Sequence, residues 1–135
     1  QMGDIAFEEY RRAIINTIEQ YIPENYGYER HISCLAGNCS FTINWQGMIR
    51  PCVMQSMPQV NVFDKGFLQG WETISNETKK ILINEACVSC RYRPICNTCA
   101  AAALLETGNY DGIPEYICEY TKEFYRIMKE GARIC

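Results

Sequence analysis

The stretch ACVSCRYRPICNTCAA (residues 86–101) contains four of the nine cysteines of the chain, Cys87, Cys90, Cys96 and Cys99. The first two form a C-x2-C pair, a spacing that lets both thiolates face one metal. Only RYRPI separates Cys90 from Cys96, whereas a zinc ribbon joins its two pairs across roughly 15 to 20 residues. The stretch is therefore too short for an independent zinc-ribbon hairpin, and it suits the wider ligand separations of a cuboidal cluster better.

The remaining cysteines are spread along the chain. They are Cys34, Cys39, Cys52, Cys118 and Cys135. We expect Cys118 to lie at the start of the last helix, where backbone amides are still free. We expect the terminal Cys135 to be a free thiol. The other eight thiols suffice for two four-thiolate sites.

The overall composition bounds the class of protein. With 135 residues, 47% of them hydrophobic, the chain is long enough for one globular domain and a flanking element. With a net charge of −3, the chain lacks the excess of positive charge that is typical of proteins that bind nucleic acid. No apolar run approaches the roughly 20 residues of a membrane span, and the charged start QMGDIAFEEYRRAI is not a signal peptide. We therefore expect a cytoplasmic protein that binds neither nucleic acid nor membrane.

Periodicity and turn residues predict a small, irregular α+β fold. The expected elements are an amphipathic helix at 4–22, a β-hairpin at 41–52 turning at Gln46-Gly47, an irregular segment at 55–70, and helices at 71–84, 100–108 and 115–131. Gly108 and Gly131 are expected to end the last two helices, and Pro114 to begin the final one. Trp45 and Trp71 are expected to pack in the core and against the hairpin. Because the loops are long, we expect bound metal to hold them in place.

The order of the cysteines resembles the SPASM domain, the auxiliary-cluster extension at the C-terminus of many radical SAM enzymes. The matching pattern is C34-x12-G47-x4-C52, then C87-x2-C90-x5-C96-x2-C99, then a lone C118. It covers most of the chain. One departure is the last spacer, Asn97-Thr98, which has two residues where the family usually has three. The resemblance implies a β-hairpin with several helices and long loops, organised around two iron–sulfur clusters.

The family's ligand scheme implies two [4Fe–4S] clusters with crossed ligands. The outer cluster would be held by Cys87, Cys90, Cys96 and Cys118. The inner cluster would be held by Cys34, Cys52 and Cys99, with Cys39 as the fourth ligand. Full ligation of both clusters favours electron transfer or structural support over direct binding of a substrate thiol.

The resemblance also implies a place in a larger enzyme. Residues 1–30 would be a helix and linker at the tail of a radical SAM barrel, and residues 31–135 the auxiliary domain. The catalytic C-x3-C-x2-C motif is missing here, so S-adenosylmethionine and a third [4Fe–4S] cluster would belong to that separate catalytic domain. The parent would be an oxidoreductase or maturase. Its partners would be its own catalytic domain, a peptide or protein substrate, and an electron donor or acceptor such as flavodoxin or ferredoxin.

Two other interpretations stay open at this point. One is a structural zinc-binding interaction module, and zinc is also expected to enter these sites during purification in air. The other is a disulfide-stapled secreted domain, which the odd number of cysteines and the start of the chain disfavour.

Three arginines lie beside predicted ligands: Arg50, Arg91 and Arg93. A [4Fe–4S]²⁺ cluster with four thiolates carries a charge of roughly −2. A nearby guanidinium would therefore raise its reduction potential. The alternative is that all three are ordinary surface arginines.

Overall fold

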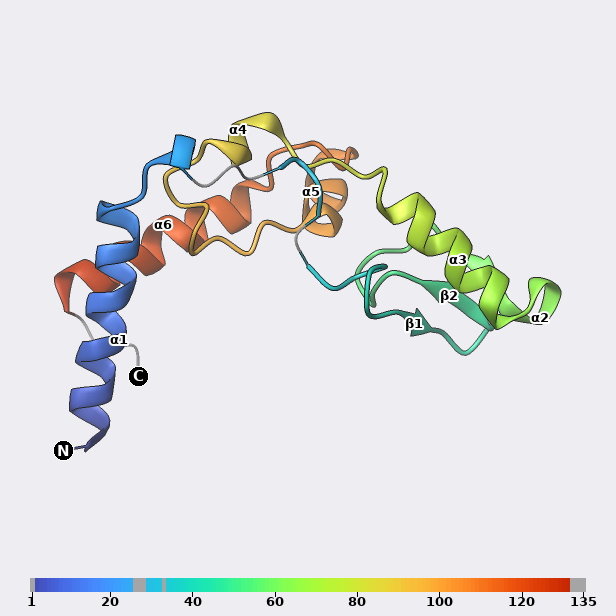
Figure 1. Cartoon of the computed structure of the whole chain (residues 1–135), viewed down its shortest axis with the longest axis horizontal. Helices are drawn as coiled ribbons and strands as arrows, with labels where there is room; N and C mark the ends of the chain where they lie inside the picture. The colour runs from blue at the N-terminus through green and yellow to red at the C-terminus, as the bar shows by residue number, and fades with distance from the viewer. Residues whose placement is uncertain (1, 26–28, 33, 132–135) are drawn as a thin grey trace.

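The structure is a computed structural model that describes residues 2–25, 29–32 and 34–131. Figure 1 shows an elongated molecule with the first and last helices at one end and a small sheet under a helix at the other. Among the described residues there are six α-helices and one three-stranded antiparallel sheet. The expected small α+β class is therefore confirmed at this coarse level.

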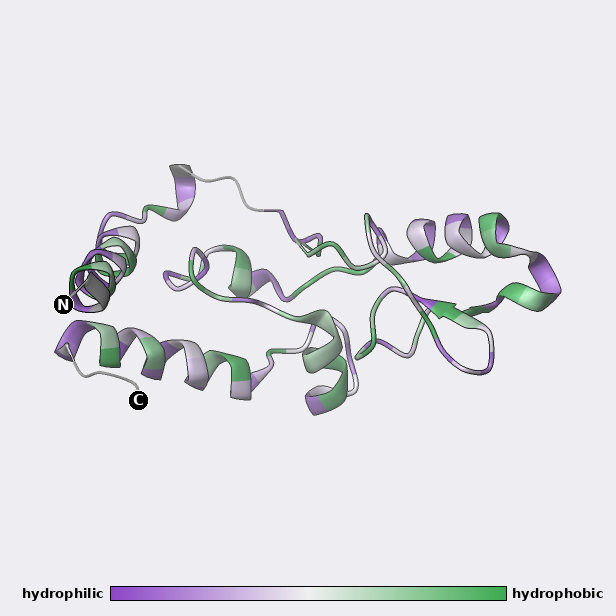
Figure 2. Cartoon of the chain, turned by 90° about the horizontal axis from the view of Figure 1, so that it is seen from below, coloured by the Kyte–Doolittle hydropathy of each residue, from purple (hydrophilic) through white to green (hydrophobic). Residues whose placement is uncertain are grey.

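The first and last helices pack against each other. α1 spans Met2–Glu19 and is followed by a short 3₁₀ turn, Pro23–Asn25, while α6 spans Glu115–Glu130. Along α6, hydrophilic and hydrophobic residues alternate (Figure 2), as expected for a helix with one buried face. The Arg11 Nη1 group donates a 2.9 Å hydrogen bond to the carbonyl oxygen of Met128. The helix assigned from sequence to a preceding barrel thus contacts the last helix of the predicted auxiliary domain.

The sheet at the other end is built on the predicted hairpin. β1 (Thr42–Ile43), β2 (Met48–Arg50) and β3 (Val60–Asn61) lie in that order, all antiparallel. The turn between β1 and β2 uses Gly47 at φ 76°, a backbone conformation that favours glycine. The Asn44 side chain accepts hydrogen bonds from the backbone N–H groups of Gln46 and Met48, which closes the turn.

Helix α3 (Phe67–Thr78) covers this sheet. Ile49 of β2 and Ile74 of α3 are both fully buried, so they form the centre of this half of the core. Gly70 lies where α3 crosses the strand, and a Cβ there would come within 3.1 Å of the Ile49 side chain. The helix therefore approaches the sheet closely because this position has no side chain.

The sequence predictions for this region need correction. The segment 55–70, expected to be irregular, contains β3, the short helix α2 (Val62–Lys65) and the start of α3. The helix expected at 71–84 begins earlier, at Phe67, and ends at Thr78. β3 forms because Val60 pairs with Ile49 of β2, and α2 begins where the Asn61 side chain accepts a hydrogen bond from Phe63 N–H. Both causes depend on neighbours that periodicity does not reveal.

The prediction for the tryptophans holds for one of them. Trp71 lies against Phe41, with ring centroids 5.6 Å apart. Trp45 lies in the hairpin turn and is 90% exposed, so its expected place in the core is wrong.

Two more helices connect the ends of the molecule. α4 (Glu85–Val88), which the sequence did not predict, starts where the Asn84 side chain accepts a hydrogen bond from Ala86 N–H. α5 (Ala100–Thr107) is mostly hydrophobic (Figure 2) and ends at Gly108, whose φ of 78° is left-handed. α6 follows Pro114 and ends at Gly131, also left-handed. The predicted ends of these last two helices are confirmed.

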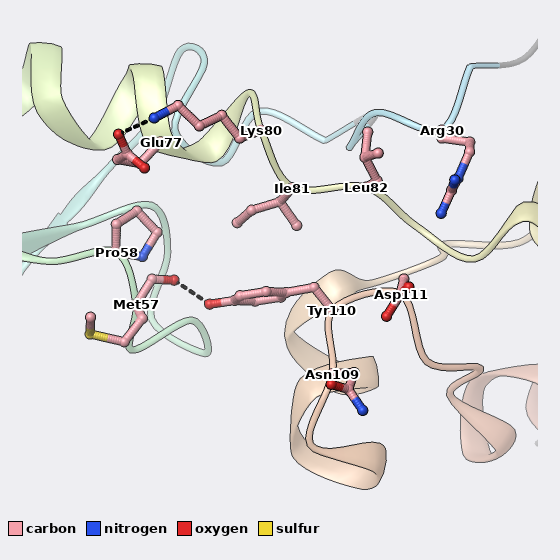
Figure 3. A pocket seen from close by; sticks show the side chains of 10 residues that line it. All are labelled: Arg30, Met57, Pro58, Glu77, Lys80, Ile81, Leu82, Asn109, Tyr110 and Asp111. Carbon is pink, nitrogen blue, oxygen red and sulfur yellow. Dashed lines mark hydrogen bonds and ion pairs between the residues drawn. The ribbon is translucent and has the colours of Figure 1, made fainter.

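The sheet half and the helical half meet in the loops between α3 and α4 and after α5. The backbone N–H of Ile83 donates a 2.7 Å hydrogen bond to the Arg30 carbonyl, and Arg30 Nε donates back to the Ile83 carbonyl. The Tyr110 hydroxyl donates a 2.6 Å hydrogen bond to the Met57 carbonyl (Figure 3). None of the described helices combines the length and apolarity needed to cross a membrane.

Candidate metal centre

Four cysteines from different segments line one cavity. Cys87, Cys90, Cys96 and Cys118 all contribute to its wall. Its volume is small, about 30 Å³, far below the several hundred Å³ of a pocket for an organic ligand. The space therefore does not suit an organic ligand of that size, and four of the residues that line it are cysteines.

Local hydrogen bonds explain how these thiols come together. Asn84 caps α4, and the N–H of Cys87 donates to the Asn84 carbonyl at 3.0 Å. The loop then coils through two consecutive turns, in which Arg93 N–H donates to the Cys90 carbonyl and Cys96 N–H to the Arg93 carbonyl. These turns return the chain to the cavity within a few residues.

The fourth thiol of the cavity, that of Cys118, lies on α6. Pro114 precedes the first residue of that helix, and its carbonyl accepts a 3.1 Å hydrogen bond from Cys118 N–H. Pro114 and Ile117 also line the cavity and make its wall partly apolar. The expected position of Cys118 near the start of the last helix is confirmed, but its own N–H is not free, because it is bonded to the Pro114 carbonyl.

The surroundings of the cavity raise the pKa of two of its thiols, Cys87 and Cys118. Burial raises the pKa of Cys87, and negative charge on Cys118, Cys96 and Cys90 raises it further, while Arg93 lowers it. Burial also raises the pKa of Cys118, chiefly with the help of Cys96. The raised pKa values of Cys87 and Cys118 oppose ionisation of these two thiols, and a bound cation would offset that effect. The donor set fits a thiolate-ligated metal centre of either the iron–sulfur or the zinc type.

Across residues 2–25, 29–32 and 34–131, no group of three or more His, Cys, Asp or Glu side chains is positioned to hold a metal ion. The four thiols of the cavity thus share its wall without the spacing of a formed metal site.

Arg93 is the cationic residue of the cavity wall. It is only 6% exposed, and its charge acts on Cys87. Arg91, two positions earlier, is exposed and lies over the ring of Tyr92, 5.6 Å from its centroid. Arg50 lies on β2, opposite Thr42. The three arginines that look alike in sequence are thus in three different environments.

The four cysteines predicted to hold the inner cluster do not line the thiol cavity. Cys34 and Cys39 are exposed, at the two ends of a tight loop, while Cys52 and Cys99 are partly buried. Cys99 directly precedes α5, where its carbonyl accepts a hydrogen bond from Ala103 N–H, and it is not among the residues lining the thiol cavity. That these four meet at a second cluster stays a prediction. Cys135 lies outside the described residues.

Hydrogen bonds within the loop that carries Cys34 and Cys39 fix its shape. The Asn38 side chain donates to the Cys34 carbonyl at 3.2 Å, and Cys39 N–H donates to the Leu35 carbonyl at 2.9 Å. Gly37 has a left-handed φ of 68° and lies against Thr78 at the end of α3. The position of these two thiols is therefore linked to the sheet half of the molecule.

A second, larger cavity of about 520 Å³ lies where the two halves meet (Figure 3). Its wall mixes charged and apolar side chains from four segments, among them Arg30, Lys80, Ile81 and Tyr110. Within this wall, Lys80 forms an ion pair with Glu77. The Tyr110 hydroxyl donates its hydrogen bond to the Met57 carbonyl, and burial raises the pKa of Tyr110. No spacing rule in the sequence points to this cavity, because its residues come from distant parts of the chain.

Comparison of the chain with models of known protein families, with curated proteins and with solved structures finds no significant match.

Proposed function

We propose that this chain is an auxiliary [4Fe–4S] cluster domain of a radical SAM enzyme that matures a peptide or protein. The observation that carries the proposal is the cavity lined by Cys87, Cys90, Cys96 and Cys118. These four cysteines come from α4, from the coiled loop after it and from α6. They are also the set that the family resemblance assigns to the outer cluster.

Two features favour a cluster over a lone zinc ion. The Cys90–Cys96 spacer is too short for the paired hairpins of a zinc ribbon. Cys99, the fourth cysteine of the stretch, does not line the cavity, whereas Cys118, which is far away in sequence on α6, does. A zinc site built from two neighbouring C-x2-C pairs would use Cys99. A scheme of two clusters with crossed ligands requires Cys118 in its place.

The residues of the cavity have distinct tasks in this proposal. The four thiolates hold the cluster, while Pro114 and Ile117 keep water from its face. When bound, a [4Fe–4S] cluster supplies a one-electron redox centre. Four thiolate ligands leave no iron open to a substrate, so this site relays electrons or stabilises the fold. The modified peptide and S-adenosylmethionine would bind to the catalytic domain.

The second cluster forms the other half of the proposal. Cys34, Cys39, Cys52 and Cys99 would hold it, and Cys99 would link it to the first cluster through the segment Asn97-Thr98. The partly buried side chain of Cys99 and its place at the start of α5 support this role.

The test is a metal analysis of the full chain after anaerobic reconstitution with iron and sulfide. Two clusters give about eight iron and about eight sulfide per chain, with visible absorbance that bleaches on reduction. About two zinc and a colourless protein that takes up no iron under these conditions would instead identify a zinc module.

A further inference from the structure

Arg93 is the one buried charged side chain among the residues that the structure describes. It is 6% exposed, and the other buried polar side chains in the described ranges, Gln55, Thr78 and Thr121, are neutral. An arginine is protonated at every physiological pH. Burying it is unfavourable unless negative charge nearby compensates it.

The thiol cavity is a source of such negative charge. Arg93 lines the cavity together with all four cysteines. Four thiolates around a [4Fe–4S]²⁺ core carry a net charge of roughly −2, which becomes roughly −3 on reduction. A fixed cation at the wall stabilises the more negative state more strongly.

We propose that Arg93 is the positioning residue that balances the charge of this centre, retaining its four thiolates and raising its reduction potential. The inference rests on the proposed function. Of the three arginines near predicted ligands, only Arg93 lines the cavity. Arg91 does not balance the charge of the centre, because it is exposed and lies over the ring of Tyr92 outside the cavity.

Arg91 is therefore a matched control. It lies in the same loop, two residues from Arg93, and carries the same formal charge. Replacing either arginine by glutamine removes one positive charge from the same loop, and only Arg93→Gln removes it from the cavity wall.

The experiment uses the full chain, reconstituted anaerobically, in four forms: wild type, Arg93→Gln, Arg93→Lys and Arg91→Gln. Potentiometric titration followed by EPR gives the midpoint of each cluster, and the signal lost in Cys118→Ala identifies the one at this cavity. We expect Arg93→Gln to move that midpoint to a more negative value or to lose the iron of this cluster. Arg93→Lys should retain the iron and most of the potential, and Arg91→Gln should match the wild type.

Three results would overturn the inference. They are an unchanged midpoint and iron content in Arg93→Gln, an Arg93→Lys protein as impaired as Arg93→Gln, and an equal shift in Arg91→Gln. The second would mean that the shape of arginine matters and not its charge, and the third that bulk charge is responsible.

Failure of the proposed function gives a different result. If the wild type itself assembles no cluster, cobalt(II) is used as the probe, because four thiolates around a divalent ion also carry a net charge of roughly −2. Weaker cobalt binding by Arg93→Gln, restored in Arg93→Lys, would support the charge-balancing role without any cluster. Equal cobalt affinity in all the variants would refute it.

Discussion

The thiols of Cys87 on α4 and Cys118 on α6 line the same cavity, where burial and then negative charge on Cys118 raise the pKa of Cys87. Neither helix contributes more than one of the four thiols. A metal centre here would therefore join α6, and α1 packed against it, to the loop between α4 and α5. In that arrangement the centre is part of the fold as well as a redox site.

Replacing Cys118 by alanine should remove one cluster and spare the other. The remaining three thiols of the cavity then leave a site one ligand short, and the iron content should fall from about eight to about four per chain. Iron and sulfide analysis after reconstitution measures this. Cys135→Ala is the control and should retain the full iron content. A Cys118→Ala protein with all of its iron, and with an EPR spectrum that matches the wild type and does not respond to added cyanide, would show that this thiol is not a ligand.

Replacing Cys39 by alanine should affect the other cluster. If Cys39 is its fourth ligand, the variant should lose that EPR signal or acquire an open iron that binds an added thiol or cyanide. The cluster at the Cys87–Cys118 cavity should keep its spectrum. An unaltered spectrum and iron content in this variant would remove Cys39 from the ligand set.

Gly37 should be essential for the loop that carries Cys34 and Cys39. Its φ of 68° is unfavourable for alanine, and an added Cβ would overlap the buried Thr78 side chain. We expect Gly37→Ala to destabilise the reconstituted protein by about 2 kcal/mol or more, measured by urea unfolding. Gly108→Ala is the control, with a similar φ of 78° but open space around it. It should cost about 1 kcal/mol, and equal losses in both variants would mean that contact with Thr78 is unimportant.

The parts of the fold that could be predicted are those whose ends are marked by local chemistry. Gly47, Gly108 and Gly131 adopt the left-handed φ that their turns or helix ends require, and Pro114 begins α6. The segment 55–70 could not be predicted in the same way. Glycines usually weaken helices, yet α3 begins directly after Gly66 and continues through Gly70. At Gly70 the missing side chain leaves room for Ile49 of the sheet.

Spacing alone groups Cys87, Cys90 and Cys96 with Cys99, whereas the family resemblance groups them with Cys118. The second grouping agrees with the shared cavity, and the ligand roles of all eight cysteines stay predictions. Spacing could not distinguish Arg93 from Arg91, since two turns of an irregular loop decide which of the two is buried.

The hydrogen bond from Tyr110 to the Met57 carbonyl should stabilise the junction between the two halves (Figure 3). Burial raises the pKa of Tyr110, so its hydroxyl remains a donor at neutral pH. Tyr110→Phe removes that donor while keeping the ring, and we expect a loss of about 1 kcal/mol in the free energy of unfolding, measured with urea. Tyr116→Phe is the control, because Tyr116 is 72% exposed on α6 and its hydroxyl should be replaceable with little effect. Since the thiols of the Cys87–Cys118 cavity belong to the helical half, Tyr110→Phe should leave the iron content unchanged. A loss of stability no larger than in Tyr116→Phe would mean that the Tyr110–Met57 hydrogen bond does not stabilise the junction.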